Sequence, residues 1–247
     1  MKTFITLLKN ELKLNIRDMN MVIFAITMPI VILVILGVIY GTKPATDNVS
    51  YTFLEQSFSA LCTISICAGG LMGLPITISE YRERKILKRF QVTPISPVML
   101  LGVEFTIYVI YSIVSMIILF VAATLIWKVQ IHGSCFSFLG SWILLMISTL
   151  SIGMMVGGIA KNAKSASVIA SILYFPMLIF SGATLPFEVM PQMMQQIVSI
   201  FPITQGIQLM KATFLGLPIV HVWQPILIMT VITVICGSIS VKCFRWE

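Results

Sequence analysis

A short charged segment interrupts an otherwise apolar sequence between Ile78 and Pro97 and reads ISEYRERKILKRFQVTPISP. It contains five cationic side chains, two carboxylates and two prolines. Ionised side chains of this kind form ion pairs and charge-assisted hydrogen bonds with a partner surface. Glu80 and Arg84 have the spacing of a helical ion pair. Residues before proline avoid the helical region, so Thr93-Pro94 ends a short helix predicted over about 80–91.

The predicted helix has one charged face and one apolar face. A positive anchor that grips anionic lipid would need the cations, but it would not need the carboxylates or the proline-stiffened end. A docking surface for a cytoplasmic partner accounts for all three features. We therefore expect these residues to couple the chain to such a partner: Glu80, Tyr81, Arg82, Glu83, Arg84, Lys85, Leu87, Lys88, Arg89, Phe90, Thr93 and Pro94.

The sequence does not indicate an enzyme active site. A phosphate-binding loop would read G-x-x-x-x-G-K-[ST], and the dipeptide Gly-Lys never occurs. No Ser-His-Asp or paired-carboxylate arrangement is visible, and His132 and His221 are expected in solvated loops. The five cysteines lack metal-type spacing, so we expect no metal site and no disulfide. The chain is predicted not to be an enzyme and to need no cofactor of its own.

Glu104 is the exceptional ionisable residue, because it lies within a long apolar stretch. A carrier driven by protons or sodium usually has several such groups in the membrane. We expect Glu104 to reach the cytoplasmic headgroups or to pair with Arg82, Arg89 or Lys161. A role in the transport pathway or in dimer contacts is the alternative. Glu55 is expected to be solvated at the outer side.

The elements that must position these residues are membrane helices. Hydrophobic residues make up 58% of the 247-residue chain and charged residues only 10%, against about 25% in soluble domains. A spanning helix needs about 20 apolar residues. We predict an all-α integral membrane protein with one domain over 1–247. The six predicted spans are about 20–40, 57–78, 101–127, 137–160, 165–185 and 222–241.

The Lys and Arg residues are distributed unequally between the predicted loops. Thirteen of the 16 lie in the N-terminal segment, in the loops after spans two and four, and in the C-terminus. Cationic loops stay in the cytoplasm, so both termini are predicted to be cytoplasmic, in a cell (plasma or inner) membrane. Nucleic-acid binding, the competing interpretation of a net charge of +7, is not favoured, since the charge is divided among four segments.

Two further segments are predicted not to span. Residues 3–19 place Phe4, Leu8, Leu12 and Ile16 on one helical stripe beside a cationic face, which is typical of an interfacial helix. The alternative is that this segment is the lower end of span one. The region 186–216 is interrupted by Pro191 and Pro202 and predicts two short helices, about 190–201 and 204–214. These helices either re-enter the outer leaflet, which we favour, or rest on the headgroups.

Proline and glycine have separate predicted roles within the spans. Pro29, Pro75 and Pro176 predict kinks, which membrane helices tolerate when neighbours satisfy the freed carbonyl. Small residues permit close helix contact, either inside the chain or between two copies. The glycines concerned are Gly69, Gly70 and Gly73 in span two, and Gly153, Gly157 and Gly158 in span four.

Two blocks of sequence resemble the type-2 ATP-binding-cassette exporter permeases. YRERKILKRFQVTP is similar to that family's E-R-E-x-G-T-L-E-x-L-x-V-T-P loop, with matches at Arg82, Glu83, Leu87, Val92, Thr93 and Pro94. The block over 180–216 resembles the family's region before its last span. Its matches are Phe180, Ser181, Gly182, Pro186, Pro191, Pro202 and Thr204. The departures are Lys85-Ile86 for Gly-Thr, Lys88 for an acid and Phe201-Pro202 for Asn-Pro.

The resemblance implies a role for each part. The charged helix would be the coupling helix on an ATPase subunit, 3–19 the connecting helix, and the region 186–216 the re-entrant pair near the exit. Glu104, Phe180, Pro186, Pro191 and Pro202 become candidate pathway or interface residues. The working unit would hold two permeases, identical or related, and two ABC ATPases that bind ATP and Mg, surrounded by membrane lipid and without nucleic acid. Spans one and five would form the dimer seam.

The predicted function is therefore ATP-driven export of an amphipathic or hydrophobic substrate, such as a drug, a lipid-linked glycan or a peptide. Two alternatives stay open on the sequence. One is a non-transporting membrane subunit for immunity or sensing, and the other is a secondary carrier. Transport that requires both ATP and the partner ATPase separates export from both alternatives.

Overall fold

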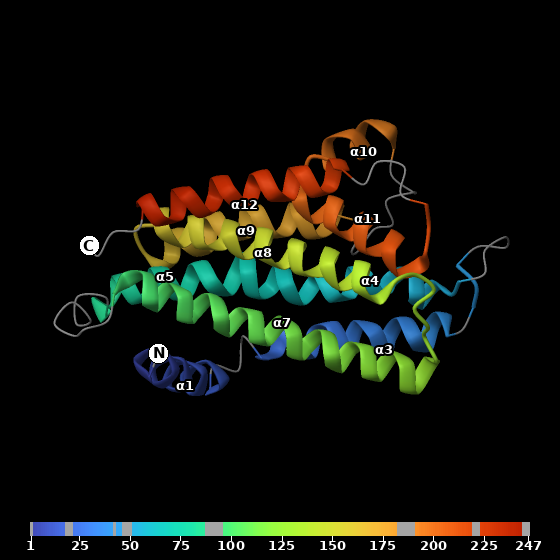
Figure 1. The fold of residues 1–247 in the computed structure, drawn as a ribbon, viewed down its shortest axis with the longest axis horizontal. Coiled ribbons are helices and arrows are strands. Elements are labelled where there is room, and N and C mark those ends of the chain that lie inside the picture. The colour runs from blue at the N-terminus through green and yellow to red at the C-terminus, as the bar shows by residue number, and fades with distance from the viewer. Residues whose placement is uncertain are drawn as a thin grey trace.

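The structure is a computed structural model that describes residues 2–17, 22–41, 43–45, 51–86, 96–181, 191–218 and 223–243. Every element named within those residues is a helix, as the composition predicts. Six helices are long and apolar enough to cross a membrane, which confirms the predicted number. They lie side by side along the long axis of the protein (Figure 1).

The first two spans are each built from more than one helical segment. Span one consists of η1 (Ile23–Thr27) and α3 (Met28–Tyr40), and span two of α4 (Phe53–Cys67), η2 (Ala68–Gly73) and α5 (Leu74–Glu83). The remaining spans are α7 (Pro97–Trp127), α8 (Cys135–Ile159), α9 (Ala163–Phe180) and α12 (Trp223–Cys243). Three shorter helices accompany them: α1 (Lys2–Arg17), α10 (Gln192–Val198) and α11 (Pro202–Leu215).

The two ends of the bundle differ in what they carry (Figure 1). One end, which we call the α1 end, holds α1, the last turn of α5 and the C-terminal end of α12. The opposite end, the α11 end, holds α10 and α11. The charged segment therefore leaves the bundle at the end where the chain also begins.

Spans two and four form the centre of the bundle. Of their most apolar stretches, 83% and 67% are buried, against 17–28% for the other four spans. α8 packs against α12, α11 and α5, and α4 packs against α3, α7 and α11. The four outer spans keep large apolar side chains exposed, which is the surface expected of helices that contact lipid.

Glycines bring the two central spans into backbone contact. A Cβ atom on Gly153 of α8 would lie 1.9 Å from the carbonyl oxygen of Gly70, and one on Gly157 would lie 3.1 Å from the Cα of Pro75. Gly153 has no room for a side chain, and at Gly157 the neighbouring atoms would have to move by a few tenths of an ångström. These glycines therefore serve packing within the chain, one of the two roles that their pattern allowed.

A widened helical turn precedes each proline of the first two spans. η1 and η2 are π-helical and end two residues before Pro29 and Pro75, respectively. The residue before each proline bonds the carbonyl five positions back, Met28 to Ile23 and Leu74 to Gly69. Proline clashes with the carbonyl four positions back, and a π turn moves that carbonyl away. Pro176 lies inside α9 without such an insertion among the named elements.

The second span is longer than predicted at both ends. It begins at Phe53 instead of about 57, because Thr52 and Glu55 form a capping box. It continues to Glu83 instead of about 78. The prediction assigned residues 80–83 to a separate charged helix and was wrong on this point, because Tyr81, Arg82 and Glu83 bond other helices of the bundle.

α1 matches the predicted helix over 3–19 with a different contact face. Leu7, Glu11 and Asn15 are its buried residues, whereas Ile16, which belongs to the apolar stripe predicted to face the membrane surface, is exposed. The buried face of α1 therefore lies beside the predicted apolar stripe. A position of α1 at the membrane surface stays a prediction.

The region 186–216 contains two short helices divided by proline, as predicted, with different bounds. Pro191 immediately precedes α10, and Pro202 opens α11, where a missing N–H has no cost. α11 is largely buried, and Gly206 approaches Leu145 of α8 closely. α11 thus belongs to the protein core. Its depth in a membrane stays a prediction.

Candidate functional site

The charged segment begins as the last turn of α5. Glu80–Glu83 continue the second span, Arg84 ends the helix, and Lys85 has a positive φ of 55°. The backbone thus turns away from the helix axis directly after Arg84, so a separate helix starting at 80 is not formed. Of the expected coupling residues, Leu87, Lys88, Arg89, Phe90, Thr93 and Pro94 lie outside the described residues.

Glu80 and Arg84 form the predicted ion pair. Arg84 Nη2 lies 2.5 Å from Glu80 Oε1, and both side chains are exposed. Exposed pairs of this kind stabilise a helix by only about 0.3–0.5 kcal/mol. The pair therefore leaves both groups accessible to a partner at the α1 end.

Arg82 points back into the bundle instead of outward. Its Nη1 donates to the carbonyl of Ala160, and its Nη2 donates to the carbonyl of Gly158 at 3.2 Å. These carbonyls belong to the C-terminal end of α8. Helix C-termini leave carbonyls without a partner and favour a cation, so Arg82 caps α8.

Glu83 caps the following helix in the same way. Its Oε2 accepts a hydrogen bond of 2.9 Å from the backbone N–H of Ala163, the first residue of α9. Asn162 caps the same end through the N–H of Ser165. A carboxylate at a helix N-terminus is favoured by the helix dipole. The neighbours Arg82 and Glu83 thus join the end of α5 to the junction between α8 and α9, and we call them the Arg82–Glu83 clamp.

Tyr81 joins the second span to α1 and α7. Its hydroxyl lies 2.5 Å from Glu11 Oε2 and 3.2 Å from Glu104 Oε1. Glu104 is only 1% exposed, so the expectation that it reaches headgroups or pairs with Arg82 or Lys161 was wrong. Arg89, the third expected partner, lies outside the described residues. The partner of Glu104 among the described residues is Tyr81, which the sequence had assigned to the surface that docks a cytoplasmic partner.

The remaining candidate residues are distributed along the last third of the chain. Phe180 ends α9 and is half-buried, Pro191 is exposed, and Pro202 is buried. Pro186 lies outside the described residues. None of these contacts the Arg82–Glu83 clamp or the Tyr81 contacts in the described hydrogen bonds, so they do not form one site with the charged segment.

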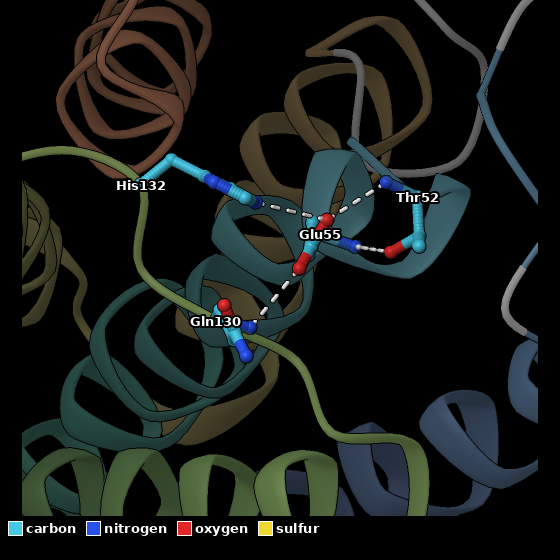
Figure 2. A network of polar contacts seen from close by, with 4 residues as sticks. All are labelled: Thr52, Glu55, Gln130 and His132. Atoms are coloured by element: carbon cyan, nitrogen blue, oxygen red, sulfur yellow. Dashed lines mark hydrogen bonds and ion pairs between the residues drawn. The ribbon is translucent and has the colours of Figure 1, made fainter. Parts of the chain in front are cut away.

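A second polar network, which the sequence did not predict, lies at the α11 end around Glu55 (Figure 2). One carboxylate oxygen accepts from the backbone N–H of Thr52 at 2.7 Å and lies 3.3 Å from His132 Nε2. The other accepts from the N–H of Gln130 at 3.0 Å. The Glu55 side chain is only 6% exposed, so the expectation of a solvated carboxylate was wrong. The spacing Thr52-x-x-Glu55 is a capping-box signal that could have predicted part of this network.

The same network reaches α11. The backbone N–H groups of His132 and Gly133 both donate to the carbonyl of Phe214, near the end of α11. Ser141 of α8 and Thr213 of α11 have hydroxyl oxygens 3.2 Å apart. The loop between α7 and α8 is thereby joined to the start of span two and to α11.

An apolar recess of about 140 Å³ lies beside this loop. α4, α7 and α8 contribute Phe58, Phe120 and Phe138 to its wall, and Ile131 comes from the loop itself. The phenylalanine rings of Phe58 and Phe138 also pack with Phe214 of α11. The recess can accept an apolar group of a few carbon atoms.

Comparison with known proteins settles the family. The profile of the family described as ABC-2 type transporter matches residues 2–215. The chain belongs to the ABC-2 type transporter family. As an ABC-2 protein it is a multi-pass membrane permease of an ABC transporter, and membership implies association with ABC ATPase subunits.

Three relatives of this ABC-2 permease carry related names. It is 22% identical over 188 residues to the putative transport permease YvfS of Bacillus subtilis (strain 168), covering 76% of the chain and 75% of YvfS. It is 27% identical over 166 residues to the inner membrane transport permease YhhJ of Escherichia coli (strain K12), covering 66% of the chain and 44% of YhhJ. It is 30% identical over 95 residues to Nodulation protein J of Rhizobium leguminosarum bv. viciae, covering 38% and 37%. The match thus spans less than half of the last two proteins.

Proposed function

We propose that this permease is the membrane subunit of an ATP-driven exporter. In this proposal a separate ATPase pushes on the segment after Glu83. The push opens an outward route for an amphipathic or hydrophobic substrate, drug-like, lipid-linked or peptide-like. The names of YvfS and YhhJ, both transport permeases, support the transport part of this proposal.

The Arg82–Glu83 clamp is the observation that carries the proposal. If the end of α5 had no contact with other helices, a force applied there would act on α5 alone. Here the same two residues bond the C-terminus of α8 and the N-terminus of α9. Force applied just beyond Glu83 therefore reaches three spans, and span two is in backbone contact with α8 through Gly70 and Gly153.

The energy source follows from the composition of the chain. It has no phosphate-binding loop, so ATP and Mg would be bound by the partner subunit. The α1 end would be cytoplasmic, because the cationic residues of the N-terminal segment and of the charged segment meet there. The exposed faces of α3 and α9 leave room for a second permease, identical or related, with two ATPases completing the assembly.

The cargo class rests on apolar surface at the α11 end. The recess beside Phe58 and Phe138 has an almost wholly apolar lining, and Met193 of α10 is exposed. Methionine-rich and aromatic surfaces accommodate varied apolar ligands. An amphipathic molecule would place its apolar part there and its polar part in water.

Reconstitution with the partner ATPase tests the proposal. The complex in proteoliposomes should move a fluorescent amphiphile only when ATP and both subunits are present, and an ionophore that removes ion gradients should not stop it. Glu83→Ala should leave the ATPase bound and active while transport per ATP hydrolysed falls on the order of tenfold. Lys164→Ala, which removes an exposed charge from the same end, is the matched control. Transport without ATP, or full coupling in Glu83→Ala, would contradict the proposal.

A further inference from the structure

Three side chains from distant parts of the chain meet near the α1 end: Glu11 of α1, Tyr81 of α5 and Glu104 of α7. The Tyr81 hydroxyl is the central group, with contacts of 2.5 Å to Glu11 and 3.2 Å to Glu104. Glu11 is 6% exposed and Glu104 is 1% exposed. The second oxygen of Glu104, Oε2, is buried and has no hydrogen-bond partner among the described residues.

No described cation forms an ion pair with either carboxyl group. On α1, Lys9, Lys13 and Arg17 are exposed. On α5, Glu80 pairs with Arg84, while Arg82 and Glu83 bond α8 and α9. The sequence of α7 contains no charged residue besides Glu104. Two carboxylates without a counter-charge would repel each other, and an isolated buried carboxylate loses its hydration.

The number of hydrogens available for hydrogen bonds also indicates that one carboxyl group of the cluster is protonated. A tyrosine hydroxyl has one hydrogen to donate, and an ionised carboxylate can only accept. Tyr81 therefore cannot donate to both glutamates. The second hydrogen bond requires a proton on one of the two carboxyl groups.

The two distances from the Tyr81 hydroxyl indicate which carboxyl group holds the proton. The contact between Tyr81 and Glu11 has the length of an O–H···O⁻ bond to an ionised carboxylate, about 2.5–2.7 Å. The longer contact involves Glu104, the more deeply buried group. We infer that Glu11, Tyr81 and Glu104 form a proton-binding site, in which Glu104 holds one proton and donates it to Tyr81 while Tyr81 donates to Glu11.

The bound proton has a mechanical consequence. It connects α1 to α5 and α7 through one continuous line of hydrogen bonds. Without the proton, the two carboxylates would compete for the single hydroxyl hydrogen of Tyr81. The attachment of α1 to the bundle would then be weaker. The folded chain binds this proton and the unfolded chain releases it, so stability falls as the pH rises through the range where the cluster deprotonates.

Infrared difference spectroscopy on the full chain in lipid nanodiscs tests the inference. At neutral pH the wild-type protein should show the C=O stretch of a protonated carboxylic acid, which is distinct from carboxylate bands. Glu104→Gln should remove this band, and Tyr81→Phe should shift it, because the acid then loses its acceptor. Glu80→Gln, which removes an exposed carboxylate from the same end, is the control and should leave the band unchanged.

A second measurement does not depend on the spectrum. Thermal unfolding followed over a pH series should show a falling midpoint for the wild type with rising pH, and a smaller dependence for Glu104→Gln, whose neutral amide can donate to Tyr81 at every pH. Absence of an acid band in the wild type, or its persistence in Glu104→Gln, overturns the inference. An identical pH dependence in both proteins does the same. These outcomes are independent of whether the complex transports anything.

Discussion

At the residue scale, Glu55 shows how one side chain organises the α11 end. Its carboxylate receives the backbone N–H of Thr52 at the start of α4 and that of Gln130 from a loop 75 residues away. His132 adds a partly exposed imidazole on the same oxygen as Thr52. A buried carboxylate with several donors stabilises each of them, because an unpaired buried N–H is costly.

Glu55→Ala should therefore destabilise the protein by about 1–3 kcal/mol, since two backbone donors lose their acceptor. The measurement is the loss of fluorescence-detected thermal stability in nanodiscs. His132→Ala is the matched comparison and should cost less than about 1 kcal/mol, because its imidazole is partly exposed. Equal losses in the two variants would show that the histidine contact, not the backbone donors, accounts for the role of Glu55.

The sequence indicated which polar residues are important, but it did not predict the partners of most of them. The Glu80–Arg84 pair was predictable because both partners lie on one helix. The partners of Glu104 and Glu55 were not, since Tyr81, Glu11 and Gln130 come close only after the spans have packed. Arg82 and Glu83 were assigned to an outward surface for the same reason.

At the scale of the elements, the contact between α8 and span two is set by the absence of side chains. Gly153→Ala would place a Cβ atom 1.9 Å from the Gly70 carbonyl oxygen, so the two helices must separate. Overpacking of a core typically costs about 1–3 kcal/mol. We expect lower thermal stability and weaker ATP-coupled transport in this variant.

Gly140→Ala on the same helix is the control. A Cβ atom there meets nothing within 4 Å, and alanine favours a helix over glycine by about 1 kcal/mol. This variant should be at least as stable as the wild type. Similar destabilisation by both substitutions would contradict the close approach of α8 and span two.

The positions of the spans along the chain could be predicted from hydropathy, whereas the π turns within them and the end of α5 could not. Six apolar stretches of the required length gave six spans, and two of the three prolines expected to kink a span follow a π turn. The π turns before Pro29 and Pro75 depend on which carbonyl each proline displaces. The end of α5 depends on Ala160 and Ala163, which lie almost 80 residues further along the chain.

At the scale of the whole protein, the arrangement predicts which surface faces which compartment. Arg84 at the α1 end and Met193 of α10 are both well exposed. In a background without the native cysteines, a membrane-impermeant maleimide added to intact cells should label Met193→Cys and not Arg84→Cys. Arg84→Cys should react once the membrane is opened. The reverse pattern would place the charged segment outside the cell and would contradict both the topology and the proposed function.

The two sides of α1 differ in their surroundings. Leu7 and Glu11 are buried against the bundle, whereas Ile5 and Ile16, on nearly the opposite side of the helix, are exposed. If α1 lies on the membrane surface, as the sequence predicts, acyl chains cover these two side chains and the lysines nearby reach the headgroups. We predict that lateral pressure in the bilayer then acts through Glu11 on Tyr81 and Glu104, so that transport depends on the thickness and composition of the surrounding lipid.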